Sequence, residues 1–288
     1  MWQWLAALAA IGGAGAAQMV ASLSSPRNDY NPSYDRSERL LVFARSDADF
    51  ANAKIYVAEN RRGRWSEPKP IRFSDPRYSD SDPWLTPDGS TLYFASNRPT
   101  VARPDKTDLD LWRSRRDRAG IWSAPEHLGE TVNGAGPELG PEYHGGTLYF
   151  SAARKSGKGG LDIYTARESG GAWSAPALLA GPFNTATSES DFTLSADGRR
   201  AVFWRMIGDK GILHIAHRAG TGWSDPAPLP DSVNVGPFNF TPSLSRDGGT
   251  LRFASTRPRP GQAEGMADIY IVKLGRMPRA CTHDRQRP

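Results

Sequence analysis

The stretch DSDPWLTPDGSTLYFASNR at residues 80–98 contains two short apolar segments separated by a turn. Its Pro87-Asp88-Gly89 signal favours a tight hairpin, because glycine tolerates a positive φ. Phe94 closes the second apolar segment, and DLWR at residues 110–113 predicts a third strand. Read together, these residues predict three consecutive antiparallel strands.

This unit recurs along the chain. The closing phenylalanines are Phe43, Phe94, Phe150, Phe203 and Phe253, spaced by 51, 56, 53 and 50 residues. Turn signals precede the last four, at residues 87–89, 144–146, 196–198 and 246–248. The first unit has Ser37-Glu38 there and lacks the glycine. A third strand follows every unit, at residues 54–57, 110–113, 162–165, 213–216 and 268–271.

A fourth element opens with Trp-Ser-x-Pro at residues 65–68, 122–125, 173–176 and 223–226. A repeat of about 50 residues with four short strands has the size of one propeller blade. One blade cannot cover both of its faces, so neighbouring blades must stack into a closed ring. We therefore interpret most of the repeated aromatic side chains as core between blades.

The fifth repeat lacks the Trp-Ser-x-Pro ending, whereas residues 19–23 (MVASL) precede the first repeat without a partner of their own. We expect this N-terminal strand to complete the last blade and remove its exposed edge. The prediction is an all-β fold, a five-bladed β-propeller of four-stranded blades over residues 18–275, with the ring closed by an N-terminal strand.

The two ends of the chain have a different composition. Residues 1–17 predict a signal peptide, with a buried N-terminal helix or an uncleaved anchor as alternatives. Residues 276–288 predict a basic disordered tail, which carries +3 of the total formal charge of +5. We expect a periplasmic or secreted monomer with no transmembrane span in the mature chain. No nucleic-acid partner is expected, because the basicity lies in the tail. The single Cys281 excludes an intramolecular disulfide and a multi-cysteine zinc site.

Residues 82–89, 92–98 and 110–112 together resemble the TolB-type, WD-like β-propeller repeat family. The pattern returns at residues 190–203, 241–257 and 268–270, and the resemblance covers about residues 19–275. It implies a propeller that serves as a binding platform. TolB itself looks like a six-bladed ring behind an additional α/β domain. This sequence has five repeats and no room for that domain, so the lipoprotein and colicin partners of TolB are not carried over.

Polar residues occupy one position of every repeat. An ungapped alignment on the closing phenylalanine brings Asn31, Asp82, Glu138, Asp191 and Thr241 into register, each twelve residues before that phenylalanine. This position lies near the start of the innermost strand, which lines the channel of a propeller. Asp80, Glu142 and Glu189 add negative charge nearby. Arg98, Arg154 and Arg257, together with Arg45 and Arg205, predict ion pairs that link these inner acids between blades.

Three interpretations of the ring remain open. In the first interpretation, which is structural, the side chains accept hydrogen bonds from backbone N–H groups of neighbouring blades. Alternatively they form a binding mouth for a peptide, a protein or a metal such as calcium, since calcium prefers oxygen ligands. The third interpretation is hydrolysis of sugars by Asp82, Glu138 and Asp191, because five-bladed glycosidases place three carboxylates on inner strands.

We predict a non-catalytic, TolB-like binding scaffold for a protein or peptide of the periplasm or cell envelope. Its binding residues would be Asn31, Asp82, Glu138, Asp191 and Thr241, and no cofactor is required. The alternative is a carbohydrate-active hydrolase that uses Asp82, Glu138 and Asp191. An enzyme requires one acid with a strongly raised pKa in a deep pocket. In a scaffold, hydrogen bonds or arginines brace all three acids.

Overall fold

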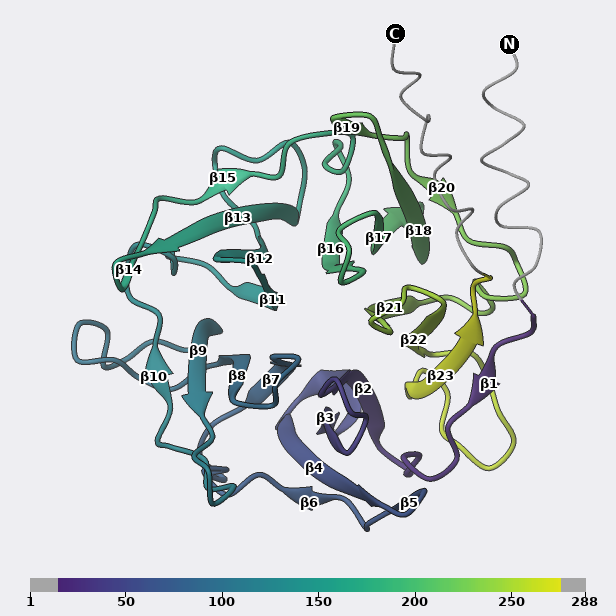
Figure 1. Cartoon of the computed structure of the whole chain (residues 1–288), viewed down its shortest axis with the longest axis horizontal. Helices are drawn as coiled ribbons and strands as arrows, with labels where there is room; N and C mark the ends of the chain where they lie inside the picture. Colours follow the sequence, from purple (N-terminus) through teal and green to yellow (C-terminus); the bar gives the residue numbers. More distant parts are fainter. Residues whose placement is uncertain (1–14, 276–288) are drawn as a thin grey trace, which may run out of the picture.

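The computed structural model describes residues 15–275. Five antiparallel sheets surround a central channel, as Figure 1 shows. The predicted five-bladed β-propeller is confirmed. The predicted tail lies outside the described residues, and so does the predicted signal peptide except for its last three residues. No helix within residues 15–275 is both long and apolar enough to cross a membrane.

Each blade contributes one strand to each of four concentric layers (Figure 1). The innermost strands are β2 (Asn28–Tyr34), β7 (Asp80–Leu85), β11 (Glu138–His144), β16 (Glu189–Leu194) and β21 (Asn239–Leu244). The second strands are β3 (Leu40–Ser46), β8 (Thr91–Ser96), β12 (Thr147–Ala152), β17 (Arg200–Ile207) and β22 (Thr250–Ser255). The third strands are β4 (Lys54–Arg61), β9 (Asp110–Arg115), β13 (Asp162–Ser169), β18 (Lys210–Ala219) and β23 (Asp268–Lys273).

The outermost layer is broken into short pieces. It comprises β5 (Arg64–Trp65), β6 (Lys69–Pro70), β10 (Glu126–His127), β14 (Ala172–Trp173), β15 (Ala177–Leu178), β19 (Gly222–Trp223), β20 (Ala227–Pro228) and β1 (Gln18–Met19). In three blades the Trp-Ser-x-Pro motif separates two pieces that pair with the same third strand. Proline has no N–H for the ladder, so the predicted fourth strand is split there.

The N-terminal segment closes the ring. Gln18 pairs with Ile271 and Met19 with Tyr270, and the Val20 N–H donates to the Ile269 carbonyl at 2.9 Å. Leu23, only 1% exposed, packs in one cluster with Phe43 of the first blade and Ile269 of the fifth. The predicted closing strand is therefore confirmed, although the paired strand itself is short.

The repeated aromatic residues form the core. All five closing phenylalanines are fully buried. Phe43 stacks on Tyr56 with ring centroids 5.8 Å apart, and Phe150 stacks in the same way on Tyr164 at 6.1 Å. The apolar clusters extend across blade boundaries: one of them joins Val42 of the first blade to Phe94 of the second. This burial between sheets is the largest favourable contribution to the stability of such a ring.

Candidate functional site

Every innermost strand bulges near its middle. In β7 the register with β8 shifts between Ser81 and Trp84, and the other four blades have the same shift. The residues at the bulges have φ between 47° and 56°; they are Asn31, Asp82, Gly140, Asp191 and Thr241. A non-glycine residue in this region is uncommon, and a β-branched one such as Thr241 is an outlier. We call these five residues the neck ring; the cavity beside them holds only about 30 Å³.

The structure places four of the predicted site residues in the neck ring: Asn31, Asp82, Asp191 and Thr241. The predicted placement of Glu138 there is wrong. Tyr143 pairs with Leu148 in the third blade, whereas Leu85 pairs with Leu92 in the second, so the third hairpin is two residues shorter. An ungapped alignment therefore misplaces Glu138 by two positions, and Gly140 occupies the ring instead.

Glu138 belongs to a second set of acids at the start of the innermost strands. It is 1% exposed and its carboxylate lies 2.7 Å from the Arg154 guanidinium. The equivalent pairs are Asp29–Arg45 at 2.6 Å, Asp80–Arg98 at 2.6 Å and Glu189–Arg205 at 2.8 Å. The predicted ion pairs therefore form within blades, not between them. In the fifth blade Asn239 replaces the acid, and the Arg257 guanidinium lies 4.0 Å from the centre of the Tyr270 ring.

Neck-ring side chains accept hydrogen bonds from the backbone of the next blade. The Thr241 N–H donates to the Asp191 carboxylate, and the Asn31 N–H donates to Thr241 Oγ1, both at 3.1 Å. The Gly140 N–H is oriented in the same way toward Asp82. Gly140 has no side chain, so it cannot accept such a hydrogen bond from the fourth blade. These contacts are those of the structural interpretation, and they fix the neighbouring blades to one another.

Asp82 and Asp191 are ionisable groups in a poorly solvated place. Burial and the charge of Asp191 raise the pKa of Asp82 to about 7. Burial also raises the pKa of Asp191 to about 6, although Thr241 and Trp204 donate hydrogen bonds to it. The Trp204 Nε1–H donates to Asp191 at 2.7 Å. Within residues 15–275 neither carboxylate is paired with a basic side chain, which distinguishes them from Glu138 and its equivalents.

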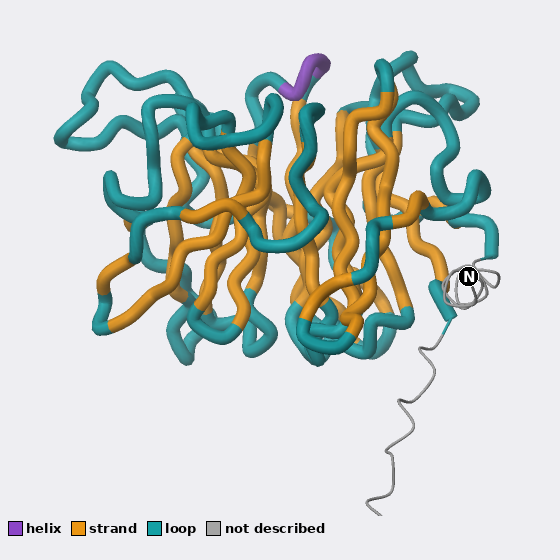
Figure 2. Tube along the Cα trace, turned by 90° about the horizontal axis from the view of Figure 1, so that it is seen from above, coloured by secondary structure: helices purple, strands orange, loops and turns teal. Residues whose placement is uncertain are grey.

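On one side of the neck ring the channel widens into a cavity of about 230 Å³ with aromatic walls. We call it the aromatic mouth; its rings are Tyr30, Phe50, Trp204, Phe238 and Phe240, and its floor includes Asp82 and Asp191. Phe50 belongs to the 3-10 turn η1 (Ala48–Phe50), which Figure 2 shows at one end of the ring near the central axis. Tyr30 and Phe240 directly precede the bulge residues and line this cavity. The innermost strands therefore begin at this end of the channel.

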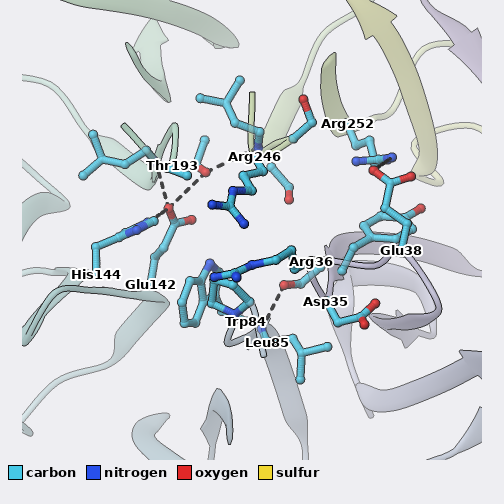
Figure 3. Close-up of a pocket in the computed structure, with 18 residues that line it drawn as sticks. Asp35, Arg36, Glu38, Trp84, Leu85, Glu142, His144, Thr193, Arg246 and Arg252 are labelled. Atoms are coloured by element: carbon cyan, nitrogen blue, oxygen red, sulfur yellow. Dashed lines mark hydrogen bonds and ion pairs between the residues drawn. The ribbon is translucent and has the colours of Figure 1, made fainter. Parts of the chain in front are cut away.

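The opposite end of the channel has a polar opening, here called the hairpin mouth, with a cavity of about 290 Å³ (Figure 3). Glu142 accepts hydrogen bonds there from His144 at 2.6 Å and from the Leu194 N–H at 2.8 Å. Glu142, one of the acids expected near the ring, therefore belongs to this opening. Arg36 and Arg246 extend into the cavity in Figure 3, whereas Arg252 pairs with Glu38 at 2.8 Å.

Sequence reasoning did not identify the aromatic mouth. Its five rings are not among the repeated aromatic residues, and they come from segments far apart in the chain. The available signal was the position just before each bulge, which holds Tyr30, Ser81, Leu139, Ser190 and Phe240. Within residues 15–275 no group of three or more His, Cys, Asp or Glu side chains is arranged to hold a metal ion. Calcium also binds backbone carbonyl, amide and water oxygens, so the expectation of calcium stays a prediction.

No protein-family model and no curated protein sequence matches the chain. Solved structures do resemble it. The α-L-arabinofuranosidase of Lactobacillus brevis is 13% identical with a TM-score of 0.60, over 88% of this chain and 92% of that one. The catalytic domain of the GH62 α-L-arabinofuranosidase of Coprinopsis cinerea is 11% identical with a TM-score of 0.58, over 85% and 90%.

TolB from Acinetobacter baumannii is 16% identical with a TM-score of 0.50; the similarity covers 88% of this chain but only 56% of that protein. The chain thus spans little more than half the length of this TolB. At such identities the likeness concerns the fold alone, and similar structures include both hydrolases and TolB.

Proposed function

We propose that this protein is an exported, non-catalytic binding propeller that receives a peptide or protein segment in its aromatic mouth. The observation that carries the proposal is the cavity of about 230 Å³, with aromatic walls and the carboxylates of Asp82 and Asp191 in its floor. A concave, largely apolar cavity with a few convergent polar groups is the usual form of a ligand site. Export to the periplasm or outside the cell, and a monomeric state, belong to the same proposal.

The alternative is a carbohydrate-active hydrolase. Three acids were expected to act together, but Glu138 is paired with Arg154 and does not line the aromatic mouth. What favours hydrolysis is that Asp82 and Asp191 both line this mouth and that burial raises the pKa of each. A glycosidase needs two carboxyl groups on either side of the scissile bond, one of them protonated. Two acids meet that minimum, so this function remains the second candidate.

The experiment is a binding screen with the purified full chain against peptides and oligosaccharides prepared from the cell envelope. Bound species would be identified by mass spectrometry, and the supernatant analysed for cleaved products. The test variant is Asp82→Asn/Asp191→Asn, which keeps shape and removes charge. The control is Arg246→Gln in the hairpin mouth. Melting curves would show that both variants fold.

Retention of intact peptide by the native chain and the control, with loss in the double variant, supports a binding propeller whose ligand enters the aromatic mouth. Equal retention by all three proteins places the site elsewhere and contradicts the proposal. Release of shortened oligosaccharides by the native chain, abolished in the double variant, establishes the hydrolase instead.

A further inference from the structure

Within the described residues, the two acids in the floor of the aromatic mouth have no basic side chain as a partner. Four acids two residues before the bulges are each paired with an arginine, at 2.6–2.8 Å. Asp82 is also buried, with 8% exposure against 0–1% for the four paired acids, and has no such partner within the described residues. The lining of the aromatic mouth contains no Lys, Arg or His. A buried charge without a counter-charge is costly, so the cavity favours a cation that enters from outside.

The walls supply an independent preference. Four ring contacts run in a continuous series: Phe50–Tyr30 at 5.2 Å, Tyr30–Phe240 at 6.0 Å, Phe240–Phe238 at 5.2 Å and Phe238–Trp204 at 5.1 Å between centroids. Phe50 is 40% exposed, so its ring is open to a ligand. Aromatic faces attract ammonium groups and pack well against methylene chains.

A third feature concerns hydrogen bonding. Asn31 Oδ1 is a buried acceptor in the neck ring that has no hydrogen-bond partner. Asn31 lines the small neck cavity together with Asp82 and Asp191 and does not line the aromatic mouth. A primary ammonium group has three N–H donors, whereas a quaternary one has none. The cavity of about 230 Å³ is smaller than the roughly 300–1,000 Å³ of sites for drug-sized ligands, so it fits one side chain.

We propose that the aromatic mouth binds a primary alkylammonium group, carried by a lysine side chain of the peptide ligand. The methylenes lie along the aromatic rings, and the ammonium group sits between Asp82 and Asp191. This assignment rests on the proposed binding function and specifies its ligand. An anion would face two carboxylates, and a neutral sugar would leave their charge uncompensated.

The test is calorimetric titration of the full chain at about pH 8, where both carboxyls are ionised. The first probe is the peptide acetyl-Gly-Lys-Gly-amide, compared with the same peptide carrying norleucine. The second pair is n-butylammonium chloride and 1-butanol, which differ in charge and little in size. Tetramethylammonium chloride tests the quaternary alternative. The variant is Asp82→Asn/Asp191→Asn.

The matched control is Asp88→Asn/Asp197→Asn, which removes two negative charges at hairpin turns on the other side of the neck ring. Asn-Gly forms such turns as readily as Asp-Gly, so this control keeps its fold. We expect the lysine peptide to bind at least about tenfold more tightly than the norleucine peptide, in the native chain and the control. In the test variant this preference disappears.

Equal affinity for the lysine and norleucine peptides overturns the assignment, and so does tighter binding of tetramethylammonium than of butylammonium. If butylammonium binds but the lysine peptide binds no more tightly than the norleucine peptide, the claim that a peptide lysine carries the ammonium group is overturned. These results leave the proposed function intact if the envelope screen still shows capture that depends on Asp82 and Asp191. If that capture is also absent, the binding function itself fails.

Discussion

Asp82 and Asp191 illustrate how one residue position can serve two purposes. The Asp191 carboxylate accepts a backbone hydrogen bond from the fifth blade, and both carboxylates form the floor of the aromatic mouth. Gly140 lies between them in the ring, and a Cβ there would come within 2.6 Å of Asp191 Oδ1. Because Gly140 has no Cβ, the Asp191 carboxylate can lie directly against the third blade at this position. Two like charges that share a buried site favour the protonated state.

The first prediction concerns pH. In the unfolded chain both aspartates titrate near their model value of 3.8, whereas in the folded chain Asp82 titrates near 7. Between these values the folded state holds more protons, so its free energy of unfolding falls as pH rises from about 4 to 7. The stabilising contribution is complete below pH 4 and lost above pH 7. Asp82→Asn/Asp191→Asn removes this dependence.

Urea denaturation of both proteins at a series of pH values measures the effect. The advantage of the variant over the native chain is expected to grow by about 4–6 kcal/mol between pH 4 and 7, because both carboxyls contribute at 1.36 kcal/mol per pKa unit. Parallel curves for the two proteins would show that these carboxyls do not titrate as described. Glu138 also has a raised pKa, and its contribution is the same in both proteins. Subtracting the free energy of unfolding of the native chain from that of the variant at each pH removes this contribution.

Among the elements, the innermost strand with its bulge is the feature that places the site. The bulge turns one residue per blade toward the axis, and proline follows it in four blades. A bulge cannot be read from apolar alternation, because it shifts the pattern by one residue. In this chain the recurring X-Pro dipeptide in the middle of a strand was the signal for it.

The second prediction concerns the third-blade bulge. Gly140→Ala places a Cβ against Asp191 at a φ of 56° and should lower the free energy of unfolding by about 2–4 kcal/mol. The control is Gly145→Ala, where φ is 54° and no atom lies within 4 Å of the new Cβ. That change should cost only about 1 kcal/mol, from backbone strain alone. Equal losses, measured by chemical denaturation, would mean that contact with Asp191 is unimportant.

The sequence predicted the strands well because their signals are local. Five buried phenylalanines, each between turn and third strand, determine the number of blades without any knowledge of distant contacts. Glu138 was misplaced because Gly145-Gly146 makes a shorter turn than Pro87-Asp88-Gly89, and register depends on turn length. The aromatic mouth was missed because Phe50 and Phe238 become neighbours of one cavity only when the ring closes.

A further repeated feature also escaped sequence reasoning. Asn133, Asn184 and Asn234 each follow the tryptophan of Trp-Ser-x-Pro by eleven residues. Each amide bonds to both backbone groups of one residue on the third strand; Asn184, for example, accepts from the Ile163 N–H at 2.7 Å and donates to its carbonyl at 2.9 Å. These asparagines hold the segment after the outermost strand against its blade, and their role is structural.

At the scale of the whole molecule, closure of the ring determines whether the channel keeps its shape. The fifth blade receives its outermost strand from the N-terminal segment, and Leu23 joins that blade to the first. The walls of the aromatic mouth come from segments in the first, fourth and fifth blades among others. The cavity therefore depends on a complete ring, not on any one blade.

The third prediction tests closure. Val20→Pro removes the N–H that donates to the Ile269 carbonyl and should lower the free energy of unfolding by about 2–3 kcal/mol. The control is Ala21→Pro, one residue further on, at an exposed position whose N–H makes no backbone hydrogen bond in the described structure. Calorimetric melting of both variants compares the effects. A Val20→Pro protein that melts with the native chain would show that β1 does not secure the ring.

The antiparallel pairing of β1 with β23 has a mechanical consequence. Gln18 lies opposite Ile271 and Met19 opposite Tyr270. The start of β1 and the end of β23 therefore lie at the same end of this strand pair. A force that pulls the N-terminal side of β1 away from the C-terminal side of β23 would break these hydrogen bonds one after another, and not all of them together. Under tension the molecule would open first at this seam, and the blades would then peel away in turn.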